Sequence, residues 1–246
     1  MRSRTQAGVT LMEMMISVVL LSFLSVGILF AMRVGLQSMD KANTRLMANR
    51  RVVGSQRVLE QQIRGLMVVA ADCSANPGMP VTGRIPFFQG QPQVMRMVSN
   101  YSLEEASRGA PRILEFMVIP GEQGKGVRLV VNEYLYTGPR STGFFCLGVG
   151  PDPATGVVGP IFRPAEPNPG SFDLADKLAY CRFVYRETMP QPVFERWLPM
   201  WMKRELPNAI RIEMGALEPS PSSIHVMSVT LPVRVDRDAL RAYADM

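Results

Sequence analysis

Few residues in this 246-residue chain have a type and spacing that could support catalysis. The one histidine, His225, lies in the alternating stretch SSIHVMSVTLPV, which predicts a strand residue with a structural or surface role. No serine stands in a GxSxG pattern, and no arrangement of cysteine and histidine resembles a nucleophile with its base. The sequence therefore predicts no catalytic residue, and we interpret the protein as non-enzymatic.

Sites for a cofactor or a metal ion have equally little support. The glycines of Gly121–Gly126 do not meet the GxxxxGK[ST] pattern, and a hairpin turn explains them better than a phosphate loop. Four acidic residues lack the regular spacing of a calcium loop: Asp152, Glu166, Asp173 and Asp176. We predict no cofactor and no metal, although calcium binding by the head stays an open question.

Three cysteines, Cys73, Cys146 and Cys181, show no CxxC spacing and, with one histidine, predict no structural zinc. If the globular part lies outside the cytoplasm, one disulfide can form and one thiol is left over. Three pairings are open. The sequence does not choose among them.

Glu13 is the residue whose position most needs an explanation. It is the only charged side chain between Val9 and Met32, an apolar run that exceeds the roughly 20 residues a helix needs to cross a bilayer. An ionisable residue at the centre of such a span costs about 2.5–3.5 kcal/mol and usually has a functional reason. We predict a membrane-spanning helix over residues 9–32. The simplest alternative is an uncleaved signal anchor in which Glu13 reaches toward the headgroups.

The order of residues around Glu13 resembles the class III signal of type IV prepilins and pseudopilins. A basic leader ends at Gly8, four residues follow (Val9-Thr10-Leu11-Met12), and Glu13 is the fifth residue after the glycine. The resemblance implies a leader peptide over residues 1–8, cleavage after Gly8 by a prepilin peptidase, and methylation of Val9. In a helix, Glu13 would lie about 6 Å along the axis from the amine of Val9. A neighbouring subunit's amine could then pair with this carboxylate and fix the axial register, which is a hypothesis about assembly.

The elements beyond the span predict an α+β protein with a pilin-like layout. An amphipathic helical pattern continues to about Ala71 within a linking segment, residues 33–76, in which Gly35, Gly54 and Gly65 permit bends or close approach. The head, residues 77–246, is expected to hold an antiparallel sheet. Its predicted strands cover residues 112–119, 127–136, 179–186, 209–214 and 224–235.

Two stretches of the head are predicted to lie outside this sheet. Gly and Pro occupy 14 of the 33 positions in 138–170, which predicts a long irregular loop. The ending, residues 236–243, is expected to form a short helix capped by Asp236.

The head sequence is similar to minor pseudopilins of the J type in type II secretion. The similarity rests on LAYCRFVY at 178–185, on Trp197, on LPNAIRI at 206–212 and on the helical VVGSQRVLEQQIR at 52–64. It implies a subunit near the tip of a pseudopilus that works in protein export across the outer membrane. A W-type minor pilin of a type IV pilus system, or a membrane-anchored periplasmic binding or hydrolytic protein, are the alternatives.

The implied partners are other minor and major pseudopilins, the prepilin peptidase, the inner-membrane assembly platform and membrane lipid. The implied location is the bacterial inner membrane, single-pass, with the head in the periplasm. Trp197 and Trp201 are candidate partner contacts, although core packing is the favoured interpretation for both. The net charge of +6 comes from scattered basic residues rather than a dense run, so we predict no nucleic-acid binding.

Overall fold

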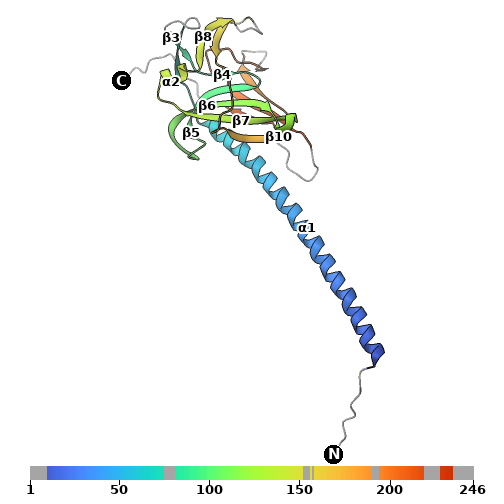
Figure 1. Ribbon diagram of the computed structural model, residues 1–246. Coiled ribbons are helices and arrows are strands. Elements are labelled where there is room, and N and C mark those ends of the chain that lie inside the picture. Colours follow the sequence, from blue (N-terminus) through green and yellow to red (C-terminus); the bar gives the residue numbers. More distant parts are fainter. Residues whose placement is uncertain are drawn as a thin grey trace, which may run out of the picture. The chain divides into compact units, whose positions relative to one another are not determined.

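The computed structural model describes residues 10–74, 81–151, 156, 158–189, 194–218 and 228–234. The chain divides into two compact units, residues 1–49 and residues 50–246. Helix α1 (Leu11–Arg64) supplies almost all of the described part of the first unit and the beginning of the second. The second unit holds every strand, as Figure 1 shows.

The strands follow the helix in chain order, with two short helical elements among them. Their bounds are β1 (Leu66–Met67), β2 (Ala70–Ser74), β3 (Val81–Pro86), β4 (Gln89–Gly90), β5 (Val94–Ser102), β6 (Ser107–Pro120), the 3-10 turn η1 (Glu122–Gly124), β7 (Val127–Leu135), α2 (Pro139–Gly143), β8 (Cys146–Pro151), β9 (Val158–Phe162), β10 (Phe172–Thr188), β11 (Glu195–Leu198), β12 (Ala209–Ala216) and β13 (Val229–Pro232). The α+β class predicted from the sequence is confirmed.

In the part of the chain that the structure describes, the main sheet has nine antiparallel strands in the order β1-β5-β6-β7-β10-β12-β13, with β4 paired to β5 and β11 paired to β10. The long strand β10 links the two halves, because its first part pairs with β7 and its second part with β12. Two separate two-stranded sheets, β2-β3 and β8-β9, complete the second unit.

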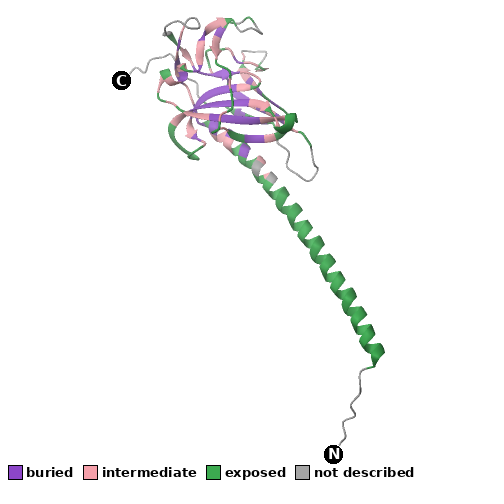
Figure 2. Ribbon diagram, in the orientation of Figure 1, coloured by how far each residue is buried: buried purple, intermediate pink, exposed green. Residues whose placement is uncertain are grey.

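Alternation along the strands gives the main sheet two buried faces. On β5, Met95 and Met97 point into the larger hydrophobic cluster, which also holds Leu59 and Ile63 of α1. Val98 points to the opposite face and joins a second cluster with Phe145 of the segment between α2 and β8. Helix α1 therefore covers one face, and Figure 2 shows the sheet strands mostly buried.

Helix α1 ends at Arg64, so the prediction that it continues to about Ala71 is wrong. Gly65 stops it, because its backbone lies against β5: a Cβ at this position would come 2.6 Å from both Ser99 Oγ and Asn100 Oδ1. The Gly65 carbonyl accepts a hydrogen bond from the Asn100 amide at 2.9 Å. Residues 66–67 and 70–74 then form strands β1 and β2, whose apolar residues had fitted a helical period equally well.

Four predicted strands are confirmed within β6, β7, β10 and β12, and so is the hairpin turn at Gly121–Gly126 between β6 and β7. The glycines Gly124 and Gly126 in this turn have positive φ values of 72° and 64°, which glycine adopts without strain. Of the predicted strand 224–235, the structure describes residues 228–234 and places β13 there; His225 lies outside the described residues. The predicted helix at 236–243 also lies outside them.

The irregular loop predicted for 138–170 is corrected in part. This segment, which we call the insertion, contains helix α2 and the hairpin β8-β9. The hairpin tolerates Gly and Pro because it forms a sheet of its own, so its strands have free edges where a missing N–H costs no ladder bond. Among its described residues, 163–170 is the longest stretch that keeps the expected irregular backbone.

Candidate functional site

The first turn of helix α1 positions Glu13. Thr10 precedes the helix, and its Oγ1 accepts a hydrogen bond from the backbone N–H of Glu13 at 3.3 Å. This is half of a capping box, a threonine cap followed three residues later by a glutamate. The pattern T-x-x-E stands in the sequence at Thr10–Glu13, although the sequence analysis did not use it. Gly8 and Val9 lie outside the described residues.

The Glu13 carboxylate is exposed and has no ion-pair partner among the residues that the structure describes. Capping explains why a residue of this type suits the first turn, where an acid also complements the helix dipole. Capping does not explain why Glu13 lies at the start of an apolar run, because an acid in the first turn of a helix needs no apolar residues beside it.

Helix α1 is apolar on all sides of its first half. Large hydrophobic side chains from Leu11 to Leu36 are exposed around the helix rather than along one stripe. Its hydroxyl groups are satisfied within the helix: the Oγ atoms of Ser17, Ser22 and Ser25 donate to the carbonyls four residues earlier at 2.7–2.8 Å. Internal satisfaction of polar groups is what a hydrocarbon environment requires. Helix α1 is long and apolar enough to cross a membrane.

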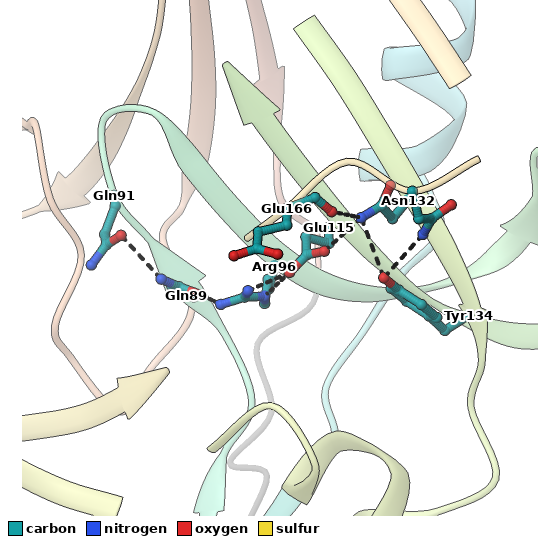
Figure 3. Close-up of polar contacts among 8 residues, drawn as sticks. Gln89, Gln91, Arg96, Glu115, Asn132, Tyr134 and Glu166 are labelled. Carbon is teal, nitrogen blue, oxygen red and sulfur yellow. Dashed lines mark hydrogen bonds and ion pairs between the residues drawn. The ribbon is translucent and has the colours of Figure 1, made fainter. Parts of the chain in front are cut away.

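The head contains a buried polar network on the face of the sheet opposite α1. Arg96 of β5 is fully buried and donates from Nε to Glu115 Oε1 of β6 at 2.6 Å and from Nη1 to Gln89 Oε1. Asn132 of β7 donates from Nδ2 to Glu115 Oε2 at 2.7 Å. Figure 3 shows Arg96 between Gln89 and Glu115. Burial lowers the pKa of the Arg96 guanidinium from its ordinary value, and the Glu115 carboxylate opposes this shift.

This network holds the insertion on the sheet. The Nδ2 of Asn132 donates to the Glu166 carbonyl at 2.8 Å, and the Nδ2 of Asn168 donates to the Tyr134 hydroxyl at 3.2 Å. The Arg96 guanidinium also lies over the Phe145 ring, 5.4 Å from its centroid. No sequence pattern indicates this network, because its members lie far apart in the chain and the strand register brings them together.

A disulfide joins Cys73 of β2 to Cys146 of β8, with Cα atoms 5.7 Å apart. The third cysteine, Cys181, is free and buried in the larger cluster, where burial raises the pKa of its thiol to about 12. The structure thus selects one of the three pairings that the sequence left open. It attaches the insertion covalently to the segment that follows α1.

The two tryptophans have different surroundings. Trp201 is 4% exposed, donates from Nε1 to the Glu205 carbonyl at 2.6 Å, and packs against Gly90. Its burial contradicts the candidate role as a partner contact and supports core packing. Trp197 is half-buried under the Arg211 guanidinium, 3.8 Å from its ring centroid.

One cleft of about 240 Å³ lies between β4, the β8-β9 hairpin and the chain after β11. Its lining includes Phe88, Phe162 and Trp201, and its charged residues are Lys203 and Arg204. The described residues that line it include no carboxylate, histidine, serine or cysteine. Among the described residues, no group of three or more His, Cys, Asp or Glu side chains could hold a metal ion.

Comparison with known proteins addresses the N-terminal segment. Residues 3–29 match the family model of the prokaryotic N-terminal methylation motif. The chain carries a prepilin-type N-terminus. The prepilin-type segment includes Gly8, Val9 and Glu13, and it indicates a type IV pilin-like protein. Together with the apolar helix it is consistent with a single-pass membrane anchor.

The match covers about a tenth of the chain and leaves the head without a counterpart. No curated protein and no solved structure matches the chain. The particular similarity of the head to J-type pseudopilins therefore rests on the sequence motifs alone.

Proposed function

We propose that the protein is a filament subunit that is cut after Gly8, methylated at Val9 and assembled through Glu13. The observation that carries this proposal is the methylation-motif match over residues 3–29, in which an unpaired glutamate follows Gly8 by five residues. Cleavage there would place a new amine at Val9, within about two helical turns of the Glu13 carboxylate.

Pairing between subunits explains why the apolar run keeps an acid. In a single helix in lipid, the Glu13 carboxylate has no described partner, and its desolvation is unfavourable. An amine on a neighbouring subunit, displaced along the axis, would compensate that charge. Since the pair forms at one axial offset only, it would also set the register between the subunits.

We further propose that the filament is the pseudopilus of a type II secretion system, with this chain as a minor subunit near its tip. The head motifs at 178–185 and 206–212 support this assignment. The Cys73–Cys146 disulfide supports a head in the periplasm, because structural disulfides form in oxidising compartments. The partners would then be major and minor pseudopilins, the prepilin peptidase and the inner-membrane assembly platform. In this assignment the chain acts by assembly and not by catalysis.

The test of this function replaces Glu13 in cells that carry the cognate assembly machinery. Losing one member of a buried charge pair typically costs about 3–5 kcal/mol. We therefore expect Glu13→Ala and Glu13→Gln to lower the cross-linked, filament-associated fraction more than about tenfold. Membrane insertion should be unchanged, because the variants make the span more apolar. The measurement is quantitative cross-linking of membrane fractions.

Glu60→Gln is the matched control, because Glu60 lies on the same helix and pairs only with exposed Arg64 at 2.5 Å. It should assemble normally. A second variant exchanges the whole apolar run, Glu13 included, for an unrelated span behind the same leader, and it should insert into the membrane but not assemble. Full assembly of the Glu13 variants, or normal function with the unrelated span, would reduce α1 to a plain anchor and contradict the proposal.

A further inference from the structure

Helix α1 carries a strongly basic stretch after its apolar run. We call residues 33–57 the basic segment: it contains six cations, Arg33, Lys41, Arg45, Arg50, Arg51 and Arg57, and one acid, Asp40. Its net charge is therefore +5. All the described cation side chains of this segment are exposed, and none has a carboxylate at ion-pair distance among the described residues.

The basic segment also exposes large apolar side chains. Leu36, Met39, Leu46, Met47 and Val53 are each more than half exposed. A solvated helix face has no reason to expose so many apolar residues, whereas a surface that becomes covered in an assembly does. Unpaired cations and exposed apolar residues together therefore indicate a surface that a binding partner covers.

A second copy of this chain does not fit that interface. Packed helices lie 8–10 Å apart, which is close to the screening length of about 8 Å at physiological ionic strength. Two basic segments side by side would place like charges within that range. Because cations are distributed from Arg33 to Arg57 and acids are nearly absent, no axial shift between two copies pairs many of them.

The membrane surface does not fit it either. Lys41 and Arg45 lie about 12 and 18 Å along the helix beyond Arg33, at the end of the apolar run. For a helix that crosses the bilayer, both distances exceed the screening length, so anionic headgroups attract these two cations weakly. A partner helix that runs alongside the basic segment can reach all of its cations.

From these observations we propose that the basic segment packs against an acidic α-helical segment of a different filament subunit, and that copies of this chain do not pack against one another there. This inference rests on the proposed function as a filament subunit. It goes further by giving the chemistry of the partner. It also gives a physical reason for low copy number: a filament made of this chain alone would accumulate repelling charge along its helices.

The test uses this chain as its own probe. In the reversed copy, Arg33→Glu, Lys41→Glu, Arg45→Glu, Arg50→Glu and Arg57→Glu change the net charge of the basic segment from +5 to −5. Processed full-length chains are labelled with donor or acceptor fluorophores and reconstituted in phosphatidylcholine vesicles. Energy transfer then measures the association of like and unlike pairs.

The wild-type chain should associate with the reversed copy about tenfold more tightly than with itself at low salt, since several exposed pairs of a few tenths of a kcal/mol act together. The two like pairs should be equally weak. The difference should nearly vanish at 1 M salt, where the screening length is about 3 Å. The matched control reverses five exposed head cations, Arg108, Lys125, Arg140, Arg204 and Arg234, and should change none of these values.

Equal association of like and unlike pairs would overturn the inference. So would an effect of the reversal that appears only when phosphatidylglycerol is added, because that result would assign the segment to lipid. Intact mass identifies chains that start at Val9 before mixing. A chain that starts at Met1 would contradict the proposed function, whereas equal association of processed chains contradicts only the charge pairing.

Discussion

Arg96 of β5 places a positive charge inside the head, paired with the Glu115 carboxylate of β6. Its guanidinium is fully buried and donates from Nε to Glu115 and from Nη1 to Gln89. Buried ion pairs contribute little net stability over an apolar pair of the same shape, but an unpaired buried charge is strongly destabilising. The Arg96–Glu115 pair is therefore important because the loss of one member would strongly destabilise the folded head.

We predict that Glu115→Ala lowers the free energy of unfolding by about 3–5 kcal/mol, because it leaves the Arg96 charge buried without a counter-charge. The double variant Arg96→Met, Glu115→Leu should recover much of that loss. Denaturant titration of the full chain in detergent, followed by fluorescence of buried Trp201, measures both.

The control pair is Arg182 and Glu213, which are 2.6 Å apart with Arg182 well exposed. Glu213→Gln should change the free energy of unfolding by less than about 1 kcal/mol. If Glu115→Ala were as mild as Glu213→Gln, the network would not hold the insertion as described.

At the scale of elements, the insertion is a small lobe with two attachments to the rest of the head. One is the disulfide between β2 and β8, and the other is the polar network around Asn132. Thr142 of α2 adds a hydrogen bond from its hydroxyl to the Ala70 carbonyl at 2.9 Å.

Removal of the disulfide should destabilise this lobe. The cysteines are 73 positions apart, so the bridge restricts a long loop in the unfolded chain, and its loss is expected to cost about 2–5 kcal/mol. We predict this loss for Cys73→Ser with Cys146→Ser, measured by denaturant titration. Cys181 forms no bridge, so Cys181→Ala is the control. In this variant, reductant should lower the free energy of unfolding as much as it does in the wild type. A reductant effect on the double variant equal to that on the wild type would contradict the assignment.

Elements with a local sequence signal could be predicted, whereas elements that depend on tertiary contacts could not. Strands β6, β7, β10 and β12 alternate clearly, and the β6-β7 turn contains glycine, so residue patterns predicted them. The end of α1 was misplaced, because Gly65 acts by close contact with Ser99 and Asn100 of β5, which sequence spacing does not reveal. Strand β5 was missed: Arg96 interrupts its apolar residues, and only Glu115 on a distant strand explains a buried arginine.

The candidate site shows the same division. Gly8, Val9 and Glu13 form a contiguous motif, so the sequence was sufficient to propose them, and the match over residues 3–29 agrees with that proposal. The pairing of Cys73 with Cys146 and the burial of Trp201 depend on tertiary packing; the sequence left the pairing open and favoured the burial without deciding it.

At the scale of the whole molecule, the two units differ in what they bury and what they expose. Residues 10–49 offer an exposed helix whose apolar run holds one carboxylate, Glu13, whereas residues 50–246 bury an ordinary core with a disulfide. The first unit has the surface of a part made to be covered by lipid or by other helices. The second has the buried core and the covalent cross-link of a domain that faces solvent.

The most direct test of prepilin-type processing is the intact mass and N-terminal sequence of the membrane-extracted chain, produced with and without a prepilin peptidase. We predict that the peptidase yields a chain that begins at N-methylated Val9, and that Gly8→Leu keeps the leader attached. Without the peptidase, the chain should begin at Met1. A wild-type chain that still begins at Met1 in the presence of an active peptidase would contradict the account.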